Sequence, residues 1–291
     1  MRATWCSRCC RAADILVGVY SKELEIAGKL AREAAAVIRE VYETPFSVVQ
    51  KAFGQGPVTE ADKRANELIV KGLQAAFPGD DIVAEESTHL PAKTNRVWFV
   101  DPLDGTREFV DRNGMFAVHI GLAIDGAPVA GVVLAPMQGA LWSGAVGSPC
   151  VLELGDQRRE LKMQPVSQTK DLRLLVSRSH KSKKTAAIRD ALGITQVREQ
   201  GSVGLKCALL AMGEADLYLH PSDRSSRWDS CAPQAVIEAA GGMLVDFGGQ
   251  KYGYDGREIV NARGLVACAR ETWPLIEETV IRIARETNLI T

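Results

Sequence analysis

The sequence has no excess of charge of either sign. Among 291 residues, 35 Lys and Arg side chains are balanced by 36 Asp and Glu side chains, which gives a formal net charge of -1 at pH 7. Binding a nucleic-acid polymer or an anionic membrane through the overall field requires a strong positive excess. The balance therefore argues against both kinds of partner, and only local basic pockets remain open as anion sites.

The sequence also lacks an apolar run of the roughly 18 residues that a membrane-spanning helix needs. Even the stretch Ala117 to Met137 is interrupted by His119, Asp125 and Pro128. Near the N-terminus, the apolar residues Ile15 to Tyr20 are too few for a signal peptide, and no small-residue cleavage pattern follows them. We expect no membrane span and no signal peptide.

Cysteine is sparse and odd in number, with seven residues in all. Four lie inside apolar stretches, where small buried thiols are at home, so a reduced cytoplasm fits best. The other three resemble half of a zinc knuckle, but no second pair of matching spacing follows, and we interpret residues 1–20 as a flexible N-terminal extension. The four are Cys150, Cys207, Cys231 and Cys268, and the three are Cys6, Cys9 and Cys10.

The first half of the chain predicts two amphipathic helices followed by a partly antiparallel sheet. Apolar residues recur at helical spacing in Ser21 to Glu43 and again from Ala65 to Ala76. Asp125-Gly126 between two apolar β-rich runs is a strong hairpin signal. Further strands are expected at Ile82 to Ala84, Arg96 to Val100 and Ala140 to Val146.

The second half changes to strands that alternate with helices, which predicts a second sheet covered by helices and an α/β (α+β) fold. We place a soft boundary in the polar stretch Gly155 to Glu160, between halves 21–158 and 159–291. Strands are expected at Leu172–Val176, Asp216–Leu219, Met243–Phe247 and Leu265–Ala269, and helices at Lys183–Leu192, Ser202–Met212, Ser230–Ala240 and Pro274–Arg285.

One stretch combines metal-binding and anion-binding groups: Asp101-Pro102-Leu103-Asp104-Gly105-Thr106, which we call the hexapeptide. Its two carboxylates suit Mg²⁺, and the N–H groups of Gly105 and Thr106 can bind an anion. Phosphate-ester hydrolysis requires such a pairing, because the negative phosphate repels a nucleophile until its charge is neutralised. The alternative is a plain Asp-rich turn in which Gly105 supplies an unusual φ.

Three more acidic residues stand at the ends of predicted elements: Asp62, Glu85 and Asp229. Thr59 and Asp62 have the spacing of a capping box, which explains both residues without a catalytic role. Asp229 has a similarly simple explanation as the N-cap of the helix that follows it. The functional alternative is that all three point into the cavity that the hexapeptide faces.

A cluster of hydrogen-bond donors follows the strand at Leu172 to Val176. Ser177-Arg178-Ser179-His180 precedes Lys181, Lys183 and Lys184, and such a cluster can grip a phosphate or a sugar. A solvated, positively charged helix start explains the same residues.

Four segments together resemble the inositol monophosphatase superfamily in their order and spacing, over roughly residues 21 to 270. The resemblance implies a layered α/β/α/β/α sandwich of the inositol monophosphatase and fructose-1,6-bisphosphatase type, and a Mg²⁺-dependent, lithium-sensitive phosphomonoesterase that is often a homodimer. The segments are Thr59-Glu60-Ala61-Asp62, Glu85-Glu86-Ser87, the hexapeptide, and Trp228-Asp229 with Ala239-Ala240-Gly241-Gly242.

Within the superfamily the chain is most similar to the CysQ-type 3′(2′),5′-bisphosphate nucleotidase branch, which removes the 3′-phosphate of adenosine 3′,5′-bisphosphate. Inositol monophosphatases place an acidic residue shortly before the Trp-Asp pair to hold inositol hydroxyls. Asp223 is nearby, so an inositol or sugar monophosphatase remains the alternative. The features behind the nucleotidase prediction are Arg107-Glu108-Phe109, Ser177 to His180, and Gly201-Ser202 followed by Leu205-Lys206.

Carried over by position, the resemblance implies five ligands for two or three Mg²⁺ ions. Carboxylates crowded into one cavity repel one another, and divalent ions neutralise that charge. The ligands are Glu85, Asp101, Asp104, Asp229 and the backbone carbonyl of Leu103.

The resemblance also implies roles around the phosphate. Glu85 and the Thr106 hydroxyl, oriented by Asp62, would position a water for in-line attack, and the N–H groups of Gly105 and Thr106 would hold a phosphate oxygen. No side chain is expected to become phosphorylated. A binder that keeps the metal site without turnover is a further alternative, but it would not need Asp62, Glu85 and Thr106.

A nucleotide substrate needs cationic donors outside the metal site, for the 5′-phosphate and the ribose. The candidates are Arg178, His180, Lys206 and Arg227, with Ser179 as a hydrogen-bonding neighbour.

Overall fold

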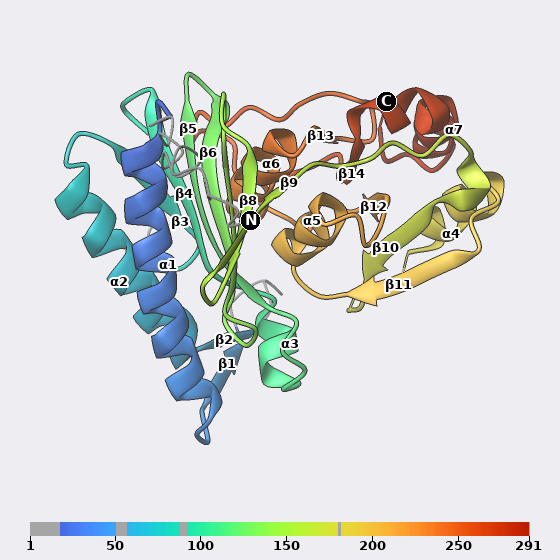
Figure 1. The fold of residues 1–291 in the computed structure, drawn as a ribbon. Coiled ribbons are helices and arrows are strands. Elements are labelled where there is room, and N and C mark those ends of the chain that lie inside the picture. The colour runs from blue at the N-terminus through green and yellow to red at the C-terminus, as the bar shows by residue number, and fades with distance from the viewer. Residues whose placement is uncertain (1–17, 51–56, 88–91, 180–181, 291) are drawn as a thin grey trace, which may run out of the picture.

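The computed structural model describes residues 18–50, 57–87, 92–179 and 182–290 (Figure 1). Of the expected N-terminal extension, only residues 18–20 are included. Cys6, Cys9, Cys10 and His180 lie outside the described residues, so the predictions made for them stay predictions.

Three layers of helices alternate with two sheets, as Figure 1 shows. Helices α1 and α2 cover one face of the first sheet, α5 and α6 lie between the two sheets, and α4 and α7 cover the outer face of the second. This arrangement confirms the layered α/β/α/β/α sandwich. The helices are α1 (Ser21–Tyr42), α2 (Glu60–Ala76), α3 (Thr106–Val110), α4 (Lys183–Ala191), α5 (Val203–Ala211), α6 (Arg227–Ala239) and α7 (Trp273–Glu286).

The first sheet has seven strands in chain order, β3 to β9. Only β3 and β4 run parallel, and the other neighbours are antiparallel. Asp125 and Gly126 both have positive φ and form the predicted turn between β5 and β6. The strands are β3 (Asp81–Ala84), β4 (Arg96–Asp104), β5 (Ala117–Ile124), β6 (Ala127–Ala135), β7 (Ala140–Ala145), β8 (Cys150–Leu154) and β9 (Gln157–Leu161).

The second sheet has the order β11-β10-β12-β14-β13, in which β10 is parallel to both of its neighbours. Its central strand β12 is buried on both faces: Leu217 and Leu219 pack toward α4 and α7, and Tyr218 packs toward α5 and α6. The strands are β10 (Arg173–Ser177), β11 (Gln196–Gln200), β12 (Leu217–His220), β13 (Gly242–Val245) and β14 (Leu265–Ala269), with a separate ribbon of β1 (Val48–Gln50) and β2 (Pro57–Thr59).

The polar stretch Gly155 to Glu160, in which we expected a soft boundary, contributes a strand to the first sheet, and the division into two halves stays a prediction. Residues Gln157–Leu161 form β9, which pairs with β8 at the edge of the first sheet. The stretch is polar because four of its five residues are exposed on this edge strand. The change from one sheet to the other comes between Leu161 and Arg173.

Helix α6 packs closely on the first sheet at a row of three glycines. Gly121, Gly131 and Gly144 are neighbours across β5, β6 and β7. A Cβ at any of them would come within 2.6 to 2.7 Å of Ala232 or Ala239. The missing side chains therefore let α6 approach the sheet closely, and this helix carries Asp229 in its first turn.

The four cysteines that we expected in apolar surroundings are buried and free: Cys150, Cys207, Cys231 and Cys268. Among the described residues, no helix is both long enough and apolar enough to cross a membrane.

Candidate functional site

Strand β4 carries two carboxylates of the site. It continues to Asp104, so the first four residues of the hexapeptide belong to the strand and not to a turn. Asp101 pairs with His119 and Asp104 pairs with Ala117, so β4 has one residue more than β5 between these pairs. Residues three apart in a regular strand point to opposite faces, whereas this bulge allows Asp101 and Asp104 to point to the same side.

Three carboxylates meet beside this bulge. One oxygen of each of Asp101, Asp104 and Asp229 lies within 4.8 Å of the other two. Glu85 follows β3 directly, and the parallel pairing of Ala84 with Val100 places it next to Asp101 at the same edge of the sheet. Four of the predicted metal ligands thus come together from three separate elements.

The crowding changes the acidity of these groups. Burial, together with the charges of Glu85, Asp104 and Asp229, raises the pKa of Asp101 well above its usual value. Burial and the charges of Asp104 and Glu85 raise the pKa of Asp229 to about 8. The cluster therefore takes up protons or a cation at neutral pH, and oxygen ligands at this separation fit a divalent cation such as Mg²⁺.

Asp62 and Asp229 are held in the same way at the third position of a helix. Thr59 N–H donates to Asp62 Oδ2 at 2.7 Å, and Ser226 N–H donates to Asp229 Oδ2. The capping box that explained Asp62 structurally is therefore present. Asp229, in contrast, is not the N-cap that we considered, because α6 starts at Arg227 after the N-cap Ser226.

The second oxygen of Asp62 reaches the hexapeptide. Thr106 Oγ1 donates to Asp62 Oδ1 at 3.0 Å and lies 3.3 Å from the carbonyl oxygen of Leu103. Gly105 has φ +103°, and a Cβ there would lie 3.2 Å from the carbonyl oxygen of Met115. Gly105 therefore allows the turn into α3, whose first N–H groups have no acceptor within the helix.

Asp104 is held by Ser202, which the sequence named only as part of the nucleotidase resemblance, and by Val203 and His119, for which the sequence predicted no role. Its Oδ2 accepts hydrogen bonds from Ser202 Oγ at 2.6 Å and from the N–H of Val203 at the start of α5. His119 Nε2 lies 3.3 Å from the same oxygen, and burial lowers the pKa of this histidine. A Cβ on Gly204 would lie 2.1 Å from His119 Nε2. For His119, the signal in the sequence was a lone histidine in an apolar strand.

Lys206, which we predicted to be a substrate-binding cation, is buried in the structure. Only 3% of the residue is exposed, and its Nζ donates to the carbonyl oxygen of Gln200 at 3.2 Å. The ammonium also lies 4.9 Å from the ring centroid of Tyr218. Burial lowers the pKa of Lys206, and the nearby Asp104 and Asp229 act against that shift. Lys206 is thus a buried counter-charge of the carboxylates.

Arg227, which we also predicted to bind the substrate, donates its hydrogen bonds within the fold. Its guanidinium donates to the carbonyl oxygens of Gly253 and Val260 at 2.8 and 2.9 Å and stacks on Tyr252 at 4.1 Å. Only 3% of Arg227 is exposed, so its guanidinium supports the loop after β13.

The remaining predicted substrate residues, Arg178 and Ser179, lie against α3. Ser179 Oγ donates to Glu108, and Arg178 Nη1 donates to Asp111 Oδ2 at 2.8 Å. A Cβ on Gly201 would lie 2.6 Å from Glu108 Cγ, so this glycine also packs on Glu108. The described parts of the three segments that carried the nucleotidase resemblance are therefore neighbours in the fold.

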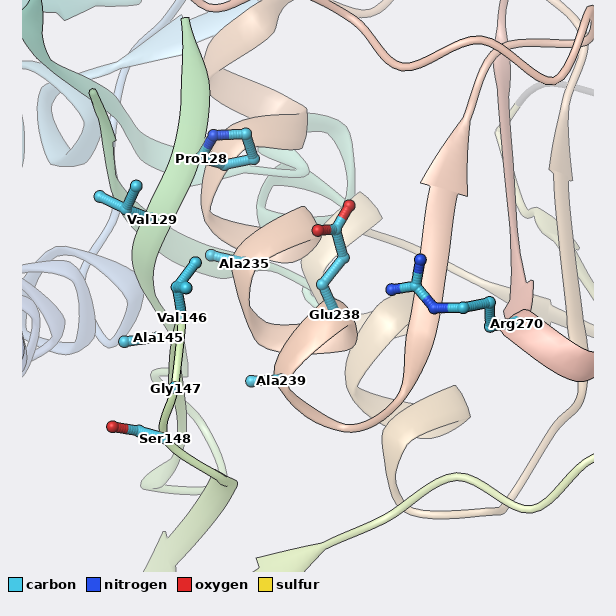
Figure 2. Close-up of a pocket in the computed structure, with 10 residues that line it drawn as sticks. All are labelled: Pro128, Val129, Ala145, Val146, Gly147, Ser148, Ala235, Glu238, Ala239 and Arg270. Carbon is cyan, nitrogen blue, oxygen red and sulfur yellow. The ribbon is translucent and has the colours of Figure 1, made fainter. Parts of the chain in front are cut away.

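Two cavities lie outside the carboxylate cluster. The smaller, of about 300 Å³, is lined by β6, β7 and the end of α6 and contains none of the predicted site residues (Figure 2). Its two charged groups are used within the fold, because Glu238 accepts from Lys251 Nζ at 3.0 Å and Arg270 donates to the carbonyl oxygen of Gly242 at 3.1 Å. The larger cavity, of about 620 Å³, includes Ser179 in its lining.

Comparison with known proteins agrees with this geometry. A model of the inositol monophosphatase family matches residues 20–288. The 3′(2′),5′-bisphosphate nucleotidase CysQ of Escherichia coli (strain K12) is 37% identical over 238 residues, which cover 79% of this chain and 93% of that protein. Inositol monophosphatase 1 of Mus musculus is 28% identical over 256 residues, which cover 83% of this chain and 89% of that protein. The crystal structure of CysQ from Bacteroides thetaiotaomicron has a TM-score of 0.72 and 27% identity, and the match covers 87% of this chain and 98% of that chain.

Proposed function

Because the chain belongs to the inositol monophosphatase family, we propose that it is a Mg²⁺-dependent phosphatase of the 3′(2′),5′-bisphosphate nucleotidase type. It hydrolyses the 3′-phosphate of adenosine 3′,5′-bisphosphate to give AMP and phosphate. The observation that carries this proposal is the meeting of Asp101, Asp104 and Asp229 within 4.8 Å.

These three carboxylates would hold Mg²⁺, with Glu85 and the carbonyl of Leu103 as further ligands in an arrangement of two or three ions. Bound Mg²⁺ supplies charge neutralisation at the phosphate, stabilisation of the leaving oxygen and a lowered pKa of the attacking water. The raised pKa values of Asp101 and Asp229 support this assignment, since a cation would remove the repulsion that causes them.

Thr106 and Glu85 would position the water. The only proton of the Thr106 hydroxyl is donated to Asp62, so toward the cavity Oγ1 is an acceptor. A water that donates one hydrogen to Oγ1 and the other to Glu85 would present its lone pair to phosphorus. The N–H groups of Gly105 and Thr106 would hold a phosphate oxygen, and the attack would transfer the phosphoryl group directly to water.

A nucleotide is favoured over an inositol phosphate by two observations. Identity to a bisphosphate nucleotidase is 37%, against 28% to an inositol monophosphatase. In addition, Glu108, Ser179 and Gly201, which come from the three segments typical of the nucleotidase branch, pack together beside α3. An inositol or sugar monophosphatase is the second candidate, because Asp223 lines the larger cavity.

A substrate panel tests the proposal. We expect Mg²⁺-dependent phosphate release from adenosine 3′,5′-bisphosphate with a kcat/KM at least tenfold above that for inositol 1-phosphate, and inhibition by Li⁺ and by EDTA. The matched inactive control is Asp104→Asn, which keeps an oxygen for the start of α5 and loses the charge. A preference for inositol 1-phosphate would support the second candidate. Binding of the nucleotide without release of phosphate would show a non-catalytic binder.

A further inference from the structure

The turn that precedes α6 determines where the Asp229 carboxylate lies. Asp229 Oδ2 accepts a hydrogen bond from the N–H of Ser226, the N-cap residue of this helix. That N–H belongs to the peptide unit that joins Ser225 to Ser226. Because a peptide unit is planar and trans, the carbonyl oxygen of Ser225 points in the direction opposite to the N–H of Ser226. A group that holds this carbonyl oxygen therefore also fixes the N–H that binds Asp229.

Asn261, in the segment between β13 and β14, holds this peptide unit and the next one. Its backbone N–H donates to the carbonyl oxygen of Ser225 at 2.8 Å. Its side-chain Nδ2 donates to the carbonyl oxygen of Ser226 at 2.7 Å and lies 3.1 Å from Ser225 Oγ. The peptide unit between the two serines is thus bound to Asn261 at its oxygen and to Asp229 at its nitrogen.

The orientation of the Asn261 amide is fixed by Arg227. Asn261 is fully buried, and its Oδ1 accepts a hydrogen bond from Arg227 Nη1. A guanidinium can only donate, so the oxygen of the amide must face it and the NH₂ group must face the turn. The guanidinium is itself held by the carbonyl oxygens of Gly253 and Val260. Arg227 therefore gives the amide one orientation, in which it can hold Ser226.

The backbone beside Asn261 pairs with the same turn. Ser226 and Val260 form a single antiparallel β-bridge, and the N–H of Arg227 donates to the carbonyl oxygen of Ile259 at 2.7 Å. The two segments therefore hold each other along three consecutive residues, so that a change at Asn261 is passed to the start of α6.

We propose that Asn261 is a positioning residue of the metal site, which holds the turn at Ser225 and Ser226 so that the Asp229 carboxylate faces the rest of the cluster. The inference rests on the proposed function, in which the carboxylates hold Mg²⁺. Loss of a residue that orients a metal ligand typically lowers metal affinity by about 10- to 100-fold. Asn261 should therefore act on the affinity for Mg²⁺ and not on the binding of the nucleotide.

Asn261→Asp tests the proposal at nearly constant side-chain size. The new carboxylate still accepts from Arg227 but has no hydrogen to donate to the carbonyl oxygen of Ser226. In calorimetric titration without substrate, we expect the Kd for Mg²⁺ to rise by about 10-fold or more. The Mg²⁺ concentration for half-maximal activity should rise by the same factor, while KM for the nucleotide at saturating Mg²⁺ changes less than twofold.

The matched control is Tyr252→Phe, in the same segment between β13 and β14. It removes the hydrogen bond from the Tyr252 hydroxyl to the carbonyl oxygen of Gly264, at 2.9 Å, and keeps the ring on which Arg227 stacks. Both variants should lose stability in urea denaturation, but only Asn261→Asp should lose affinity for Mg²⁺. The Kd of Tyr252→Phe is expected within twofold of the wild-type value.

Amide hydrogen exchange of the wild-type protein gives a second measurement that needs no variant. If the turn favours Mg²⁺ binding, bound Mg²⁺ must favour the turn by the same factor. Mg²⁺ should therefore slow the exchange of the Ser226 and Asn261 amides about fivefold more strongly than that of Asp216, which donates to the carbonyl oxygen of Arg173 in the second sheet.

Three results would overturn the inference and leave the proposed function standing: an unchanged Kd for Mg²⁺ in Asn261→Asp, an equal change in Tyr252→Phe, or an exchange rate of Ser226 that does not depend on Mg²⁺. Weaker Mg²⁺ binding in Asn261→Asp alone, in a protein that hydrolyses no nucleotide, would support the inference and refute the proposed function. A wild-type protein that binds no Mg²⁺ would refute both.

Discussion

Thr106 Oγ1 donates a hydrogen bond to Asp62 Oδ1 at 3.0 Å, while the other oxygen of Asp62 accepts from the N–H of Thr59 at 2.7 Å. One carboxylate thus fixes the start of α2 and also the rotation of the Thr106 hydroxyl. Because the two oxygens have different tasks, substitutions can remove one task and leave the other.

Thr106→Val removes the hydroxyl and keeps the size of the side chain. We expect kcat to fall about 100-fold, because the attacking water loses its acceptor. KM should change little. The control is Thr59→Ala, which weakens the cap of α2, lowers the free energy of unfolding by about 1 kcal/mol and leaves kcat within about tenfold. Steady-state kinetics and urea denaturation measure both effects. An unchanged kcat in Thr106→Val would show that the Thr106 hydroxyl has no role in the reaction.

The stability gained from Mg²⁺ should increase with pH. Folding raises the pKa of Asp101, and that of Asp229 to about 8, so without metal the folded state binds more protons than the unfolded state. The free energy of unfolding of the metal-free protein then falls as pH rises from the ordinary Asp pKa of about 4 toward the raised value. Saturating Mg²⁺ replaces those protons and removes this fall.

Urea denaturation in EDTA and in saturating Mg²⁺, at about pH 5.5 and about pH 8, measures this difference. Groups outside the site contribute equally in both solutions and cancel. In Asp229→Asn the increase with pH should be smaller, because one of the two perturbed carboxyls is gone. A Mg²⁺ effect of the same size at both pH values would contradict the metal assignment.

The position of His119 predicts an effect on metal binding alone. Its Nε2 lies 3.3 Å from Asp104 Oδ2 at a fully buried site. Residues that orient a metal ligand typically change metal affinity by about 10- to 100-fold when they are removed. We expect His119→Ala to raise the Mg²⁺ concentration for half-maximal activity within that range, with KM for the nucleotide changed less than twofold.

His119→Gln, which can place a polar atom near Asp104, should recover part of the Mg²⁺ affinity. Such recovery would show that His119 orients the Asp104 carboxylate and does not only fill space. If the alanine variant needs no more Mg²⁺ than the wild type, His119 only fills space.

The sequence predicted the elements with a strong period and missed those without one. The apolar residues that recur at helical spacing in Ser21 to Glu43 lie in α1, because burial of one helix face imposes that period on the sequence. Asp125 and Gly126 form the turn between β5 and β6 that their residue types predicted. Strand β11 has four exposed residues out of five at the sheet edge, so no alternation marked it. Helix α3 is only five residues long.

The site was predictable where it depends on acidic residues at the ends of elements. Asp101, Asp104 and Asp229 meet where β4 ends and α6 begins, and the resemblance to the family's motifs implied this meeting. The bulge in β4 was not predictable, since it depends on the pairing with β5. The burial of Lys206 and Arg227 could not be predicted from the sequence either, because the type of a residue does not show which carbonyl oxygens surround its side chain in the fold.

Ser202 is the described residue that most resembles a nucleophile, and its surroundings give it another task. Its Oγ donates to Asp104 Oδ2 at 2.6 Å, an arrangement that could activate a hydroxyl. Ser202 Oγ also accepts a hydrogen bond from the N–H of Leu205 at 3.2 Å, so this hydroxyl caps α5 as well. A hydroxyl that is engaged as both donor and acceptor has little freedom to attack phosphorus.

Ser202→Ala is therefore expected to lower the free energy of unfolding by about 1 kcal/mol, as loss of a cap does, and to keep kcat within about tenfold. Rapid quenching of the wild-type reaction with substrate labelled in the 3′-phosphate should yield no labelled protein, because water receives the phosphoryl group directly. A chiral phosphate would be released with inverted configuration, which a single in-line displacement requires. A labelled peptide that contains Ser202, together with a loss of kcat of about a thousandfold in the alanine variant, would instead establish a covalent intermediate.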